Sequence, residues 1–164
     1  MHETEIKWTP QWYRYIKIGN AALLLIFLGM AVFAPNLGIA GLMLFFLLMY
    51  LILFLIEQKK AVVKYDRENI YFKWLFWDEK ISLSAVNTIC WSTRTNVLNR
   101  NRTETRLYLY FELTDRFWTL SDVIDQNDIN ACLAGKGENL PLMRLYNFYE
   151  NEYPKKALGL NEEW

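Results

Sequence analysis

The 39 consecutive residues from Ile18 to Ile56 include no charged side chain. A single helix crosses the roughly 30 Å hydrocarbon core of a bilayer with about 20 residues, so this run is long enough for two crossings. Pro35 and Asn36 form the strong break inside it. The sequence therefore predicts a transmembrane helical hairpin over residues 18–56, with helices at 18–34 and 37–56, preceded by an interfacial segment over residues 1–17.

Basic residues flank the predicted hairpin on both sides, and its short loop has none. Three precede the first helix and four follow the second: Lys7, Arg14, Lys17, Lys59, Lys60, Lys64 and Arg67. Loops rich in Lys and Arg remain on the cytoplasmic side of a membrane. We therefore expect a multi-pass protein of a bacterial inner (plasma) membrane with both termini in the cytoplasm. The first apolar stretch lacks a signal-peptide cleavage site and runs into the second, so we expect it to stay in the protein.

The composition argues against several classes of chemistry. The chain has 18 basic and 18 acidic residues, which removes the electrostatic case for nucleic-acid binding. Its one histidine, His2, is close to the N-terminus, where we expect it to be mobile. Cys90 and Cys132 lie far apart in the sequence and are expected to be small, buried, reduced residues. We predict no catalytic residue, no metal site and no cofactor.

Beyond the hairpin, alternating hydrophobicity predicts an antiparallel sheet with short connections. The expected strands are residues 61–65, 70–77, 80–83, 87–95, 104–113 and 116–120, and in one of them Leu107, Leu109, Phe111 and Leu113 alternate with wetter residues. Two helices follow, one capped by Asp125 and ending at Ala134, the other beginning near Asn139. The second has an apolar stripe of Leu142, Leu145, Tyr146 and Tyr149. The predicted domain is residues 57–153, and residues 154–164 form a loosely ordered tail.

These segments resemble the bacterial membrane-anchored PH-like proteins, in which a two-helix transmembrane hairpin precedes a cytoplasmic PH-like domain. The matching positions are Tyr65, Asp66, Ile70, Ile81, Val86 and Ile89. The resemblance covers roughly residues 15–135 and leaves the helix after Asn139 unassigned. It implies a membrane α+β fold with an antiparallel PH-like sheet and C-terminal helices, and it carries no catalytic signature.

Four arginines, Arg94, Arg100, Arg102 and Arg106, stand near a predicted hairpin turn with one acid, Glu104, among them. They are candidates for binding an anionic lipid headgroup. The alternative, which we favour, is a solvated turn partly neutralised across the strands by Glu104.

The strand predicted over residues 70–77 is apolar on both faces. Tyr71, Trp74 and Trp77 are therefore candidates for binding a partner. Coverage of one face by the last helix is an equal alternative. The acidic pairs Asp78–Glu79 and Asp122–Asp125 are expected to be solvated turns and helix caps, not catalysts.

The sequence thus favours a non-catalytic membrane protein that binds another protein. Its most specific form is an immunity protein that neutralises a membrane-acting or secreted toxin by direct binding. The alternative is a lipid-headgroup-sensing or accessory subunit of a larger membrane complex. The partner and the oligomeric state stay open.

Overall fold

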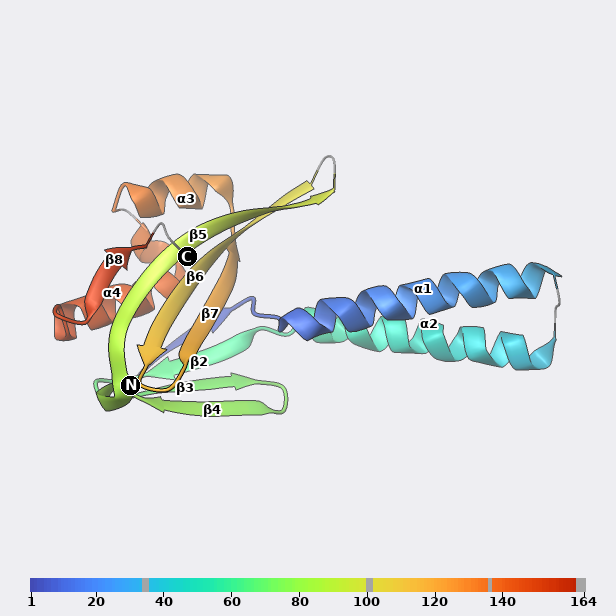
Figure 1. Ribbon diagram of the computed structural model, residues 1–164, viewed down its shortest axis with the longest axis horizontal. Coiled ribbons are helices and arrows are strands. Elements are labelled where there is room, and N and C mark those ends of the chain that lie inside the picture. Colours follow the sequence, from blue (N-terminus) through green and yellow to red (C-terminus); the bar gives the residue numbers. More distant parts are fainter. Residues whose placement is uncertain (34–35, 100–101, 136, 162–164) are drawn as a thin grey trace. The chain divides into compact units, whose positions relative to one another are not determined.

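The chain forms a β-strand, continues into two long helices, and returns to pair with that same strand (Figure 1). A computed structural model describes residues 1–33, 36–99, 102–135 and 137–161. They belong to two units, one made of Thr9–Lys59 and the other of Met1–Trp8 together with Lys60–Trp164. We call the first the helical unit and the second the sheet unit.

The helical unit consists of α1 (Gln11–Phe33) and α2 (Leu37–Glu57). Both are long and apolar enough to cross a membrane, with mean hydropathies of 2.1 over Tyr15–Phe33 and 2.9 over Leu37–Glu57. The predicted break falls between them. Asn36 caps α2 by accepting a hydrogen bond from the backbone N–H of Ile39 at 2.9 Å, whereas Pro35 lies outside the described residues.

Polar contacts join the two helices. Asn20, which is buried, donates a hydrogen bond from its side chain to the carbonyl of Phe46 at 3.1 Å. Where α1 begins and α2 ends, Lys17 pairs with Glu57 and the Tyr13 hydroxyl donates to the Leu53 carbonyl. An amide that finds a partner on the neighbouring helix adds about 0.6–2 kcal/mol to helix association in an apolar environment.

Among its described residues, the sheet unit contains two four-stranded sheets. Sheet A has the order β1-β2-β3-β4 and is antiparallel; its strands are β1 (His2–Ile6), β2 (Ala61–Tyr65), β3 (Asn69–Trp74) and β4 (Trp77–Ser82). Sheet B has the order β7-β6-β5-β8, formed by β5 (Val86–Asn99), β6 (Arg102–Leu113), β7 (Phe117–Ile124) and β8 (Ala157–Leu160). It is mixed, because β8 runs parallel to β5.

Short helices complete the sheet unit. They are η1 (Leu83–Ala85), α3 (Gln126–Leu133), η2 (Gly137–Asn139) and α4 (Pro141–Glu152). Asp125 is the N-cap residue of α3, and Gly135 follows its end with φ +70°, a backbone conformation suited to glycine. Both boundaries confirm the sequence expectation. The predicted stripe of α4 is also confirmed, because its four residues are buried.

Side chains from the two sheets meet in the core of the sheet unit. The rings of Phe72 and Trp118 lie 6.1 Å apart, edge to face. Glu79 of β4 accepts hydrogen bonds from the Trp118 indole at 2.9 Å and from Arg116 at 2.6 Å, so one carboxylate bonds β7 and the turn that precedes it. Helix α4 is fastened by the Tyr149 hydroxyl, which donates to the carbonyl of Asp66 at 3.0 Å.

Two segments expected to lie outside the domain belong to its sheets. Residues 1–17 were expected to form an interfacial segment, but β1 pairs with β2 over five register positions. His2 is accordingly held in β1, with its ring 5.4 Å from that of Tyr65 and 5.0 Å from that of Phe148. The tail, residues 154–164, was expected to be loosely ordered, yet it contains β8. Both pairings are long-range, so no local pattern signals them.

The burial of β1 gives a first prediction. Ile6 is 1% exposed, so replacing it with Ala should lower the free energy of unfolding of the sheet unit by about 2–5 kcal/mol. The exposed Glu3→Ala on the same strand is the matched control, with an expected change within about 0.5 kcal/mol. Urea unfolding of the full chain in detergent micelles measures both. Equal stability of the two variants would show that β1 is not part of the core.

Candidate functional site

The aromatic segment predicted as one strand, residues 70–77, folds back on itself. β3 ends at Trp74, Leu75 and Phe76 form the turn, and β4 begins at Trp77. The expectation of a single strand with two apolar faces is therefore wrong. Leu75 has φ +51°, a left-handed conformation usually occupied by Gly or Asn in such turns, and the absence of those residues hides the turn from sequence analysis.

Two of the three predicted partner-binding residues lie together, and the third lies on the opposite face of the sheet. Trp74 and Trp77 are cross-strand neighbours on one face of sheet A, where Trp74 is 4% exposed and Trp77 49%. Tyr71 lies on the other face, half-buried, with the amine of Lys80 5.2 Å from its ring centroid. Of the three, Trp77 is the most accessible to a partner.

Trp8 completes an aromatic cluster that sequence analysis missed. Its ring lies 4.9 Å from that of Phe72, 5.3 Å from that of Trp74 and 6.4 Å from that of Trp77. Each pair is arranged edge to face, the geometry that aromatic quadrupoles favour. Trp8, two residues beyond the end of β1, thus packs against the end of the β3–β4 hairpin.

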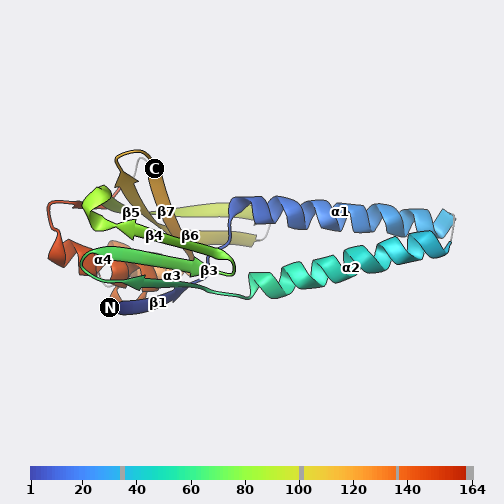
Figure 2. The same cartoon turned by 90° about the horizontal axis from the view of Figure 1, so that it is seen from below.

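The hairpin tip, defined as Leu75, Phe76 and Trp77, exposes its apolar side chains. Leu75 is 37% exposed, and the Phe76 side chain makes so little contact with its surroundings that its relative exposure is 103%. Figures 1 and 2 show β3 and β4 as the paired green strands of this hairpin. Three adjacent large apolar residues at a turn are unusual, because turns normally consist of Gly, Pro, Asn, Asp and Ser.

The arginine candidates are also divided. Arg94 of β5 is exposed. Arg106 of β6 is only 7% exposed, and its guanidinium donates to Glu104 at 2.6 Å and to the Ser121 hydroxyl at 3.4 Å. Arg100 and the side chain of Arg102 lie outside the described part of the chain. The ion pair with Glu104 agrees with the expected neutralisation, but at a buried position instead of a solvated turn.

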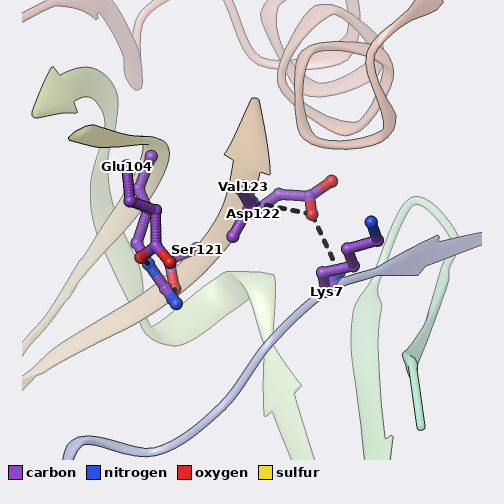
Figure 3. Close-up of polar contacts among 6 residues, drawn as sticks. Lys7, Glu104, Ser121, Asp122 and Val123 are labelled. Carbon is purple, nitrogen blue, oxygen red and sulfur yellow. Dashed lines mark hydrogen bonds and ion pairs between the residues drawn. The ribbon is translucent and has the colours of Figure 1, made fainter. Parts of the chain in front are cut away.

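A second buried polar contact ties β7 to the end of β1 (Figure 3). The Asp122 carboxylate, 6% exposed, accepts hydrogen bonds from the backbone N–H of Lys7 at 2.8 Å and of Val123 at 3.0 Å. Burial raises the pKa of Asp122, and the two N–H donors oppose that shift only in part. Asp122 was expected to be solvated, which is wrong.

The other predicted acidic pair is also structured. Asp78 and Glu79 lie within β4 and not in a turn, and Glu79 binds Arg116 and Trp118 as described above. Asp125, by contrast, is the expected helix cap. Glu79 and Asp125 therefore act as structural acceptors in the sheet unit.

The outer face of sheet B carries a pair of tyrosines. Tyr108 and Tyr110 are two positions apart on β6, and their rings stack at 5.9 Å with an interplanar angle of 18°. Both are partly exposed, and the exposed Arg94 lies on the same face of β5. Thr119 of β7 is the cross-strand neighbour of Tyr110. We call these four residues the tyrosine face.

A groove of about 820 Å³ lies between α4, the α3–η2 connection and β8. Tyr146, one of its lining residues, donates its hydroxyl hydrogen to Glu150 at 3.3 Å. Burial, with the nearby Glu150 charge, raises the pKa of Tyr146 to about 12. Tyr146 is thus protonated at neutral pH.

Cys132, which also lines this groove, and Cys90 are both free and buried, as expected. Burial raises the pKa of each thiol, which disfavours the reactive thiolate. Within the described ranges of the chain, no group of three or more His, Cys, Asp or Glu residues is arranged to hold a metal ion.

The buried Asp122 gives a prediction on pH dependence. Its pKa is higher in the folded chain than the ordinary 3.8, so between these two values the folded state binds more protons than the unfolded state. Asp122 therefore stabilises the fold less as pH rises from 3.8 through the raised pKa. Asn at this position keeps an acceptor for both N–H groups and does not titrate.

The stability of the wild type minus that of Asp122→Asn should consequently fall with increasing pH across this window. Urea unfolding at a series of values from about pH 3 to 7 measures the difference. Subtracting the variant removes the contribution of other groups, such as Asp66, whose pKa is lowered. A difference that does not change with pH would contradict the assignment.

Comparison with protein-family models, with curated proteins and with solved structures finds no match to this chain.

Proposed function

We propose that the chain is a membrane-anchored, non-catalytic protein that binds another protein. In this proposal α1 and α2 cross a bacterial inner membrane as a hairpin, and the sheet unit is a PH-like domain on the cytoplasmic side. The partner binds at the tyrosine face.

The surfaces of the helices support the membrane crossing. Only 6% of the apolar window in α1 and 11% of that in α2 is buried within the protein, whereas a core helix of a water-soluble protein is mostly buried. The pairing of β1 with β2 adds a second argument, because strands that share a sheet must lie on the same side of a bilayer. Two crossings between them satisfy this requirement.

The strand order supports the PH-like identity. Among the described residues, the antiparallel strands β1 to β4 and β5 to β7 come before the C-terminal helices, which supports the antiparallel domain with C-terminal helices that the resemblance implies. The parallel strand β8 is an addition to that pattern. The helical hairpin lies in the connection between the first two strands of the domain.

The tyrosine face is the observation that carries the binding proposal. Tyrosine and arginine are the residue types enriched at the energetic centres of protein interfaces. A tyrosine ring also offers a large contact area at a small cost in side-chain entropy. The stacked pair of Tyr108 and Tyr110 is therefore partly ordered before a partner arrives.

An immunity protein is the most specific form of this proposal. Such a protein needs a membrane anchor and a binding face but no catalytic site. The toxin would be the product of an adjacent gene.

Headgroup recognition by the arginines is a weaker second candidate. Arg94 supports it as an exposed cation. Arg106 does not, because it is buried and bonded to Glu104 and Ser121.

Replacing Tyr108 with Ala tests the binding proposal. Cells that produce the full chain together with the product of the adjacent gene should lose protection, and co-purification of the two proteins should weaken by about 2 kcal/mol, or thirtyfold. The fold should persist because Tyr108 is only partly buried. Circular dichroism and protease resistance verify this.

The matched control is Tyr71→Ala on the outer face of sheet A, which should keep full binding. Loss of binding in both variants, or in neither, would contradict the tyrosine face as the partner site. If Tyr108→Ala has no effect, while Arg94→Glu abolishes association with anionic vesicles and added salt weakens the wild-type association, headgroup recognition is favoured.

The topology has its own test. A Cys replacing Asn36 should react with a membrane-impermeant maleimide in intact spheroplasts, because the α1–α2 connection lies outside the cytoplasm in this proposal. A Cys replacing the exposed Ser84 of the sheet unit should react only after lysis. Cys90 and Cys132 are buried and contribute little labelling. The reverse pattern would invert the orientation.

A further inference from the structure

The hairpin tip combines an unfavourable turn with an unfavourable surface. Leu75 adopts a left-handed backbone conformation that is unfavourable for a residue with a branched side chain, and Asn or Gly would remove most of that cost. Phe76 is fully exposed. Neither residue contributes to the core as Trp74 does, so the fold of the sheet unit gives no reason for an apolar turn.

The strand register locates this tip within sheet A. Ile6 pairs with Ala61, Val62 pairs with Lys73, and Trp74 pairs with Trp77. The turn at Leu75 and Phe76 is therefore at the end of the sheet where β1 finishes and β2 begins. It extends one or two residues past Ala61, or about 3–7 Å at the usual rise of a strand.

This end of sheet A is also where the chain continues into the helical unit. Gln11, where α1 begins, is three chain steps after Trp8, and Ala61 is four chain steps after Glu57, where α2 ends. A fully extended chain covers at most about 3.5 Å per residue, so these connections reach no further than roughly 11 and 14 Å. Chain length alone then keeps this end of the sheet near the surface of any membrane that the helices cross.

We propose that the hairpin tip inserts into the lipid interface of the membrane that anchors the protein. Trp and Phe are the side chains that favour this region, where aromatic rings meet both acyl chains and headgroups. Lys73, exposed and just before Trp74, lies where its amine can reach headgroup phosphates. The inference rests on the proposed membrane crossing. The tip would hold the sheet unit at the membrane in addition to the two chain connections that lead to α1 and α2.

Aromatic residues between β1 and the first turns of α1 also support insertion of the tip into the lipid interface. Trp8 contacts both Trp74 and Trp77, and Trp12 and Tyr15 in the first turns of α1 are 49% and 74% exposed. Tryptophan and tyrosine therefore flank the apolar stretch of α1 and the base of the tip alike. This is the composition of an aromatic belt at a membrane surface.

The experiment uses the full chain in nanodiscs of phosphatidylcholine and phosphatidylglycerol. An environment-sensitive nitrobenzoxadiazole probe is attached to Phe76→Cys, and in separate samples to Leu75→Cys, Glu68→Cys and Leu28→Cys. Glu68 is the matched control, because it is exposed in the β2–β3 turn at the opposite end of the same sheet. Leu28, exposed on α1, reports whether the helix is in lipid.

The proposal expects the probes at positions 75 and 76 to be quenched by brominated lipid and to lose quenching by aqueous iodide, while the probe at 68 shows the opposite. If the probe at 28 is in lipid but those at 75 and 76 respond like 68, tip insertion is wrong and the anchor stands. If the probe at 28 is itself in water, the proposed crossing fails. Protection of the tip from both quenchers would indicate a protein contact and would also overturn lipid insertion.

Discussion

The pairing of β1 with β2 determines how this chain is organised. Five register pairs join strands separated by about fifty residues, and closing an unstructured loop of that length costs several kcal/mol of chain entropy. The helical unit reduces this cost, because α1 and α2 lie antiparallel and bring the N-terminal end of α1 next to the C-terminal end of α2. The contacts of Tyr13 with Leu53 and of Lys17 with Glu57 hold these ends beside each other. A helical hairpin thus takes the place of a short turn in a β-sheet.

Local patterns in the sequence predicted the parts of the fold that depend on local physics. The uncharged run gave the two apolar helices, and the asparagine in its break caps the second of them. The spacing of Leu142, Leu145, Tyr146 and Tyr149 marked the buried face of α4. In each case the prediction depends on hydrophobic periodicity or on a capping residue. Both involve residues close together in the sequence, so a single sequence is enough to find them.

The features that sequence analysis missed depend on contacts between residues far apart in the chain. The segment His2–Ile6 has only Thr4 and Ile6 as buried positions, and its strand exists because β2 lies next to it. β8 likewise depends on β5. For the candidate site, the predicted residues were accessible only in part: Trp77 and Arg94 are exposed, whereas Trp74 and Arg106 are buried. Burial of an arginine depends on partners from other positions, here Glu104 and Ser121, and strand alternation alone does not reveal it.

The short segment between β1 and α1 explains why an acidic residue is retained in the core. The backbone N–H groups of Lys7 and Val123 both point to the same place in the sheet unit, and a buried N–H without an acceptor costs about 1–3 kcal/mol. One Asp122 oxygen accepts both bonds, so the carboxylate offsets two such penalties against its own desolvation. Ile6, Lys7 and Trp8 are then held successively by core packing, by this carboxylate and by the aromatic cluster. The chain consequently leaves the sheet unit bound to sheet A through Ile6 and Trp8 and to sheet B through Lys7. The Asp122 carboxylate is therefore the group that ties the end of β1 to β7.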